Sequence, residues 1–393
     1  MHRATPTLPA ARLLLAAVLS AVWAAPAHAL DREHAAEAEA AIDRGIAYLR
    51  TQQNDDGSWS PRVGPAITGL VLNALLNEAD IAPGDPQAAQ AIDYILDQAN
   101  DDGTIGSGFL DNYNTAICVS ALSRVKGDPR VAEVIDRARL ALRMLQWDGQ
   151  RDPEGNVVDE DHPWYGGAGY GNSGRPDMSN TQFMIQALYD LGVDCNDPVF
   201  QRAVAFVSRC QGYPGNDLFA DRIVHDGGFI YATSINKDLI GVPESKANPE
   251  QMDEAKLGRP VSGLRTYGSI TYAGFKSYVY AQLPADDPRV EMARQWISEN
   301  YTLDRNPGMP EDMKDQGLYY MYLALARALD ADGATYITTP EGKKHDWAND
   351  LIAELVERQR DDGSWVNVAD RWMEDNPVLV TAYSVLALQH ALD

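Results

Sequence analysis

A short signature occurs three times in this chain and constrains its fold more than any other feature. It reads Q-N-D-D-G-S-W at 53–59, Q-R-D-D-G-S-W at 359–365 and Q-A-N-D-D-G-T at 98–104. Each copy lies between an amphipathic helical stretch and a more apolar one. Because such repeats form arrays of similar structural units, we predict a chain built from helix pairs, with its functional site where the pairs converge.

The alternation of half-polar and apolar stretches predicts six helix pairs. In the first member of a pair the apolar residues share one face, as with Ile42, Ile46 and Leu49. The second member is apolar nearly all round, so we expect an outer, half-solvated layer around a buried inner one. The expected outer and inner helices are 42–49 with 67–76, 91–96 with 115–122, 131–145 with 181–191, 199–207 with 271–283, 290–297 with 318–329, and 351–356 with 378–388.

The connections between these helices are unequal in length. Short links from inner to outer helices carry an Asp-Pro pair at 85–86, 128–129, 197–198 and 287–288. Asp caps a helix start and Pro suits its first turn, so these pairs predict helix starts. The opposite links contain long insertions at 147–177 and 211–269, and all links of this kind lie at one end of a ring. We therefore place the site at that end, the mouth.

The signature itself has a structural interpretation. Its glycine permits the left-handed conformation that ends a helix, its tryptophan covers the turn, and its glutamine satisfies open helix ends. The residues concerned are Gln53, Gly57, Trp59, Gln359, Gly363 and Trp365. A calcium site is the alternative for the Asp-Asp-Gly runs, but the twelve-residue loop with its terminal Glu is missing.

Composition bears on location and partners. The formal net charge of −24 excludes nucleic acid and anionic membranes as partners, since both need a basic face. Residues 1–29 have two arginines, an apolar run at 13–25 and A-H-A before position 30, which is typical of a secretory signal cleaved after Ala29; an uncleaved anchor is the alternative. We expect an exported, periplasmic or secreted protein with one domain at 30–393 and no further membrane span. Its three cysteines are expected to be buried free thiols.

The repeats resemble the Q-W motifs of squalene and oxidosqualene cyclases and of protein prenyltransferase β subunits, which share an α/α toroid. The stretches D-M-S-N-T-Q at 177–182 and D-R-W-M-E at 370–374 are similar to exported bacterial prenyltransferase and squalene-oxidase repeat proteins. The resemblance covers the chain from about residue 35 and implies an all-α fold, an α/α toroid of six helix pairs in two concentric layers. It also implies an apolar, isoprenoid-like ligand or lipid in the central cavity.

The residues that perform chemistry in these families are altered here. The cyclases protonate an alkene with the middle Asp of D-x-D-D-T, and the matching stretch at 177–181 is D-M-S-N-T. Asp177 remains as a candidate catalytic residue, whereas Ser179 and Asn180 replace the acid and become ligand-binding candidates. A hydroxyl or an amide is too weak an acid for this step, so cyclisation started by protonation is not expected from this stretch.

Cofactor motifs are also missing. The prenyltransferases hold zinc with Asp, Cys and His, but Cys118 has no Asp two residues before it and no inner helix starts with His. There is no G-x-S-x-G, H-E-x-x-H or phosphate loop. We therefore predict neither a cofactor nor a metal.

Aromatic residues gather near the expected mouth. The candidates for ligand contact are Trp164 and Tyr165 in one insertion, and Tyr272 and Tyr319 near the starts of inner helices. Such rings line apolar pockets or stabilise cations. The alternative is that they belong to the core, because every buried helix carries such residues.

Carboxylates near the mouth support a rival hypothesis. Paired carboxylates cleave glycosidic bonds, and the candidates here are Asp159, Glu160, Asp161, Asp177, Asp226, Glu374 and Asp375, with His162 and His225 as possible bases. This pattern leaves open a carbohydrate-active enzyme, a glycosidase or a lyase. The alternative is that these acids are ordinary solvent-exposed charges on loops. A third hypothesis is a noncatalytic scaffold whose insertions bind a protein partner.

Overall fold

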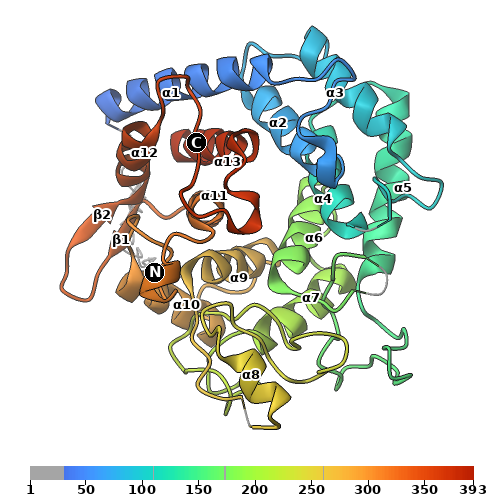
Figure 1. Cartoon of the computed structure of the whole chain (residues 1–393), viewed down its shortest axis with the longest axis vertical. Coiled ribbons are helices and arrows are strands. Elements are labelled where there is room, and N and C mark those ends of the chain that lie inside the picture. The colour runs from blue at the N-terminus through green and yellow to red at the C-terminus, as the bar shows by residue number, and fades with distance from the viewer. Residues whose placement is uncertain (1–30, 109, 172–173, 260) are drawn as a thin grey trace, which may run out of the picture.

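A computed structural model describes residues 31–393 except 109, 172–173 and 260. This part of the chain forms a ring of six helix pairs in two concentric layers (Figure 1). The outer layer contains α1 (Arg32–Thr51), α3 (Pro86–Asp97), α5 (Pro129–Leu145), α7 (Pro198–Arg209), α10 (Pro288–Asn300) and α12 (Trp347–Arg358). The inner layer contains α2 (Ala66–Asn77), α4 (Asp111–Leu122), α6 (Met178–Asp190), α9 (Gly268–Tyr280), α11 (Leu318–Asp332) and α13 (Pro377–Leu392). The predicted signal sequence lies outside the described residues.

A few short elements decorate the ring. They are α8 (Gln251–Lys256), the strands β1 (Tyr336–Thr338) and β2 (Lys344–Asp346), and the 3-10 turns η1 (Pro61–Val63), η2 (Glu311–Met313) and η3 (Arg371–Met373). The two strands pair antiparallel, with Ile337 opposite His345. None of these elements was predicted, because each is too short to show a periodic pattern.

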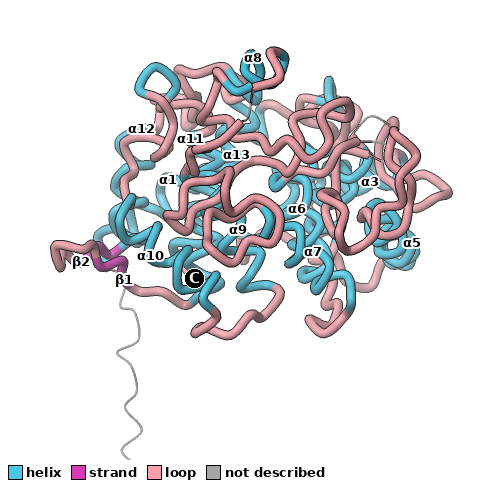
Figure 2. Tube along the Cα trace, turned by 90° about the horizontal axis from the view of Figure 1, so that it is seen from below, coloured by secondary structure: helices cyan, strands magenta, loops and turns pink. Residues whose placement is uncertain are grey.

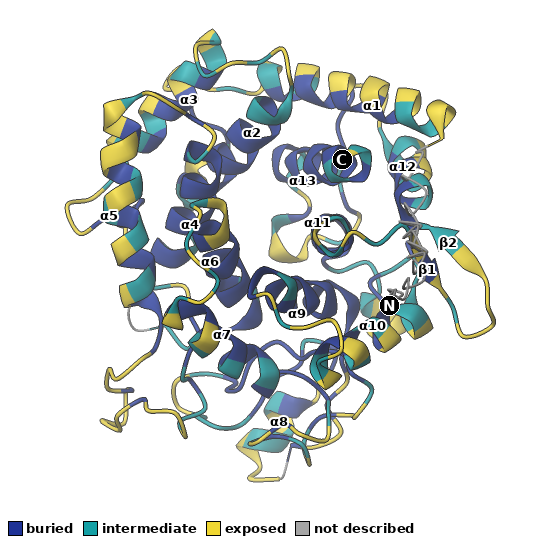
Figure 3. Cartoon of the chain, turned by 180° about the vertical axis from the view of Figure 1, so that it is seen from behind, coloured by how far each residue is buried: buried dark blue, intermediate teal, exposed yellow. Residues whose placement is uncertain are grey.

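Burial separates the two layers as the hydrophobic pattern predicts. The inner helices are buried on nearly every side, whereas the outer helices expose one face (Figure 3). The predicted all-α fold is confirmed. The ring closes where α13 packs against α2 and α1 packs against α12 and α13. At this closure Gln389 Nε2 donates to the backbone oxygen of Ala74 at 2.9 Å.

The Asp-Pro pairs start outer helices as predicted. Asp85, Asp128, Asp197 and Asp287 are the N-caps of α3, α5, α7 and α10. Each carboxylate accepts a hydrogen bond from the amide two residues later, and the proline occupies the first turn.

The signature turns join neighbouring outer helices. Gln53 Nε2 donates to the backbone oxygen of Gln87 in α3 at 2.9 Å, and Trp59 Nε1 donates to Leu49 of α1 at 2.7 Å. The prediction that Gly57 ends a helix is wrong, because α1 ends at Thr51. Gly57 has a φ of 85° and packs so closely on α3 that a Cβ would lie 2.4 Å from a backbone oxygen. The glycine therefore permits close approach of the turn to the next helix.

Long loops gather mainly on the side of the ring that carries α8, and short turns on the other (Figure 2). On that side the inner helices begin and both insertions lie, which is the mouth expected from the sequence. All three cysteines are free thiols; Cys118 and Cys210 are buried, whereas Cys195 is half-buried. In the described part of the chain no helix is long and apolar enough to cross a membrane.

Candidate functional site

A cavity of about 400 Å³ lies at the mouth, where the inner helices begin. Both the inner helices and the loops above them contribute to its wall. The aromatic lining residues are Tyr113, Tyr170, Phe183, Tyr231, Tyr267, Tyr320, Trp372 and Tyr383; the aliphatic ones are Val63, Ile67, Leu110, Ile270, Met373 and Leu379; the polar ones are Ser179, Ser269 and Glu374. A pocket of this size and character is typical of small-molecule sites.

Aromatic rings from four inner helices form a continuous wall of this cavity. Tyr113 of α4 meets Phe183 of α6 edge to face, with ring centroids 5.3 Å apart. Tyr320 of α11 lies 6.2 Å from Phe183 and 6.1 Å from Tyr383 of α13. Burial raises the pKa of these tyrosines, so their hydroxyls stay protonated at neutral pH. The wall therefore offers ring surfaces and neutral hydroxyls.

Glu374 is the acidic member of the lining. Its Oε1 accepts from the amide of Tyr320 at 2.8 Å, and its Oε2 from Asn367 Nδ2 at 2.5 Å. The carboxylate thereby binds free amide groups at the start of α11. Burial raises the pKa of Glu374 to about 7, although these hydrogen bonds act in the opposite direction. Both protonation states of this carboxyl group are therefore populated at neutral pH.

The loop before Glu374 has strained backbone. Trp372 and Met373, which both line the cavity, have φ values of 59° and 67°. Side chains other than glycine rarely adopt this conformation, and it persists where surrounding contacts hold it. Here the carboxylate of Glu374 ties the end of the loop to α11. The strain places an indole and a thioether at the rim of the cavity.

The altered acid stretch lies at the start of α6. Ser179 lines the cavity together with Tyr320, whose hydroxyl accepts from Gln182 Nε2 at 3.2 Å. Asp177 is buried behind this surface as the N-cap of α6, and its carboxylate accepts from the Asn180 amide at 2.9 Å and from Asn180 Nδ2. Neither Asp177 nor Asn180 is among the lining residues. Burial raises the pKa of Asp177, and the nearby Arg175 opposes that change.

The four aromatic candidates lie apart from the cavity. Trp164 is buried in a separate small cluster with Trp147, and its Nε1 donates to Ser234 Oγ at 2.8 Å. Tyr165 borders a surface groove near Arg202 and Arg209. Tyr272 and Tyr319 belong to the core between the layers, as the sequence alternative proposed. None of the four lines the cavity, and their part in ligand binding stays a prediction.

The orientation of α11 about its own axis explains why Tyr320, and not Tyr319, lines the cavity. Tyr319 packs against Tyr322, whose hydroxyl lies 3.4 Å from Glu354 of α12. Tyr320, one residue later, points into the cavity instead. Successive residues of a helix differ by about 100° in direction. Two adjacent tyrosines at a helix start carry no signal of which one faces inward.

The carboxylates predicted at the mouth have different environments. Among the seven, Glu374 alone is a lining residue of the cavity. Asp226 accepts from Thr266 Oγ1 at 2.7 Å and holds the second insertion together. His162 contacts Asp152 at 3.1 Å, and His225 contacts the backbone of Ala220. Both histidines thus have partners within the loops.

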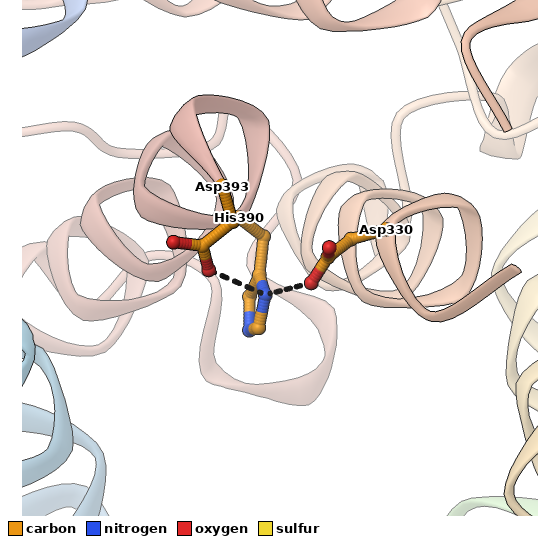
Figure 4. Close-up of side chains that lie close together, drawn as sticks. All are labelled: Asp330, His390 and Asp393. Carbon is orange, nitrogen blue, oxygen red and sulfur yellow. Dashed lines mark hydrogen bonds and ion pairs between the residues drawn. The ribbon is translucent and has the colours of Figure 1, made fainter. Parts of the chain in front are cut away.

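At the other end of the inner helices three side chains lie close enough to hold a metal ion (Figure 4). His390 Nδ1 lies 2.8 Å from Asp330 Oδ2 and 3.8 Å from Asp393 Oδ2. Arg327 Nε points at the other ring nitrogen of His390 at 3.4 Å. A neutral imidazole that donates to Asp330 and accepts from Arg327 satisfies this arrangement. The buried guanidinium opposes a metal ion, so we interpret the cluster as a link between α11 and α13.

Comparison with known proteins addresses the fold. No known family model matches the chain, and no curated protein does. A substrate complex of the type II terpene cyclase MstE from Scytonema is 14% identical with a TM-score of 0.38, covering 92% of this chain and 99% of that one. The ring of six helix pairs described above is itself an α/α toroid. A glycosidase variant is 13% identical with a TM-score of 0.47, and the match covers 92% of this chain and 99% of that one. A protein from Actinoplanes is 15% identical with a TM-score of 0.35, and the match covers 91% of this toroid and all of that chain. At this similarity the matches do not distinguish one activity from another.

Proposed function

We propose that this toroid binds an apolar, isoprenoid-like ligand in the cavity at its mouth. The observation that carries the proposal is the lining itself, in which eight aromatic and six aliphatic residues surround about 400 Å³. Removing apolar ligand surface from water into such a pocket contributes roughly 25 cal/mol per Å². The sequence hypothesis of an exported apolar-ligand protein is thus kept, and export itself remains a prediction.

The carbohydrate hypothesis has less support. Glycosidases use two carboxyl groups that flank the scissile bond. Of the described residues that line the cavity, Glu374 alone carries one. The carboxylate of Asp177 is occupied by Asn180 at the start of α6. We therefore take ligand binding, and not sugar cleavage, as the function to test.

The test measures thermal stability with farnesol, geranylgeraniol and squalene. A ligand at a hundredfold excess over its Kd stabilises the folded state by about 2.7 kcal/mol, so the Tm should rise by a few degrees. Ser179→Trp fills the cavity and should abolish the rise, whereas Tyr165→Ala, in the separate surface groove, should leave it unchanged.

Native mass spectrometry of the same mixtures gives a second readout of binding. Circular dichroism of Ser179→Trp checks that this variant is folded. The proposal fails if the wild type shows neither a Tm rise nor a retained ligand with any of the three compounds. Release of reducing ends from a glycan panel would instead support the rival hypothesis.

A further inference from the structure

Glu374 is buried without a positively charged partner. It is 1% exposed, and its hydrogen bonds come from amide groups: the backbone of Tyr319 and Tyr320, and the side chain of Asn367. Within the described residues no lysine, arginine or histidine forms an ion pair with it. A carboxylate removed from water is costly unless a cation compensates it. This carboxyl group therefore lacks the partner that its position calls for.

One other buried carboxylate near the cavity does have such partners, while the buried acids Asp177 and Asp111 lie outside the cavity lining. Glu244 binds Arg175 at 2.5 Å and also contacts Lys246. The contrast matters because Glu374 is also the lining residue that can present a negative charge to a ligand.

The surroundings of Glu374 suit an organic cation. Tyr320, Tyr383 and Trp372 line the same cavity. Besides burial, the negative charge of Glu374 contributes to the raised pKa of Tyr383. Tyrosine and tryptophan ring faces attract alkylammonium groups, by about 0.5–2 kcal/mol each, most strongly where water is excluded. In this protein Tyr231, another lining residue, already has Lys246 Nζ 4.6 Å from its ring centre on one side.

We propose that the ligand of this cavity is an amphiphilic organic cation, an apolar chain with an amine or quaternary ammonium group that pairs with Glu374 among the aromatic rings. This inference rests on the proposed function and names the class of ligand. The acidic surface, with a formal net charge of −24, also favours the approach of cations over that of anions.

The pH dependence of binding follows from the groups around Glu374. Neighbouring tyrosines have raised pKa values and stay neutral below pH 9; they are Tyr267, Tyr319, Tyr320 and Tyr383. Arg371 lies over the Trp372 ring, Arg175 and Lys246 pair with Glu244, and Arg358 pairs with Glu354. The pKa of three further acids near the mouth, Asp177, Asp111 and Asp226, is also raised, in each case mainly by burial. Burial raises the pKa of Glu374 to about 7, and a cation binds its deprotonated form. Affinity for the cation should therefore increase about tenfold for each unit by which the pH rises toward 7, and level off above pH 7.

The experiment compares two ligands with the same chain, farnesyltrimethylammonium and farnesol, by calorimetric titration at pH 5.5 and 8.5. We expect the cation to bind the wild type at least tenfold more tightly at pH 8.5, and farnesol to bind equally at both. Glu374→Gln should remove the pH dependence. Asp375→Asn, an exposed acid on the same loop, should retain it, as should Asp177→Asn.

Proton release gives a readout that needs no variant. At pH 6, titration of the cation in two buffers with different ionisation enthalpies should report release of nearly one proton per ligand, and none with farnesol. If farnesol binds but the cation shows neither pH dependence nor proton release, the inference is overturned and the proposed function stands. A pH dependence that persists in Glu374→Gln and disappears in Asp177→Asn also overturns it. If neither ligand binds, the proposed function itself fails.

Discussion

At the scale of single residues, the rim of the cavity combines strain with an isolated charge. Trp372 and Met373 hold left-handed backbone, which costs on the order of 1–3 kcal/mol each. The hydrogen bonds from the start of α11 to Glu374 offset part of that cost. Strain of this kind persists where it positions a functional group, and here it brings the Trp372 indole and the Glu374 carboxyl group to the same cavity.

The ionisation of Glu374 should make the folded state less stable as pH rises. Its pKa is about 7 in the folded protein and 4.5 ordinarily. The contribution of the protonated group is complete below pH 4.5 and is lost as pH rises through 7, a change of roughly 3 kcal/mol. Urea unfolding at pH 4.5, 6 and 8 measures it as the difference between the wild type and Glu374→Gln. Asp375→Asn should follow the wild type, and parallel profiles for all three proteins would contradict the assignment.

At the scale of elements, one device recurs between neighbouring outer helices. Gln146 Nε2 donates to the backbone oxygens of Gly166 and Val199 at 2.9 and 3.0 Å. Gln211 Nε2 does the same with Gly227 and Arg289 at 3.0 and 2.8 Å. Gln53 Nε2 makes the same two bonds, to a glycine of its own turn and to the start of the next outer helix. We call this pair of bonds the glutamine joint; it occurs in the signature turns and also in the two helix pairs that carry the insertions.

This device explains how far the sequence could be interpreted. Helix pairs and Asp-Pro caps were predictable because their signals lie within one helix. The joints at Gln146 and Gln211 were not, since 20 and 16 residues separate each glutamine from its glycine. The site was predictable only in part: Ser179 starts an inner helix and lines the cavity. Tyr231 and Tyr267 lie in an insertion, where no period indicates which ring faces inward.

The joint predicts a large effect of a single methyl group. A Cβ at Gly166 would lie 1.8 Å from the backbone oxygen of Arg202 in α7, whereas a Cβ at Gly155 would meet nothing within 4 Å. Both glycines have positive φ, at 81° and 91°, so Gly155→Ala controls for backbone strain. We expect Gly166→Ala to lose at least ~2 kcal/mol more unfolding free energy than Gly155→Ala in urea. Equal losses would mean that the loop moves away from α7 freely.

At the scale of the whole molecule, closure distinguishes this array from an open solenoid. Gln389 of α13 donates to Ala74 of α2 and accepts from Asn77 at 3.0 Å. On the outer layer Gln359 Nε2 donates to Ala41 of α1 at 2.9 Å. Each inner helix therefore has two inner neighbours, including the first and the last in sequence. Closure encloses the cavity, because its wall includes residues of both α2 and α13.

A closed ring should not fray from its ends. In an open array the terminal repeats exchange amide hydrogens fastest, because they have one neighbour each. Here we expect α2 and α13 to exchange as slowly as α6, measured by native-state hydrogen exchange with mass spectrometry. Gln389→Ala should raise exchange in α2 and α13 together, since it breaks bonds to both Ala74 and Asn77, while Gln295→Ala on the exposed face of α10 should change neither. Faster exchange of α13 alone in the variant would mean that the last helix is held by its own pair and not by the ring.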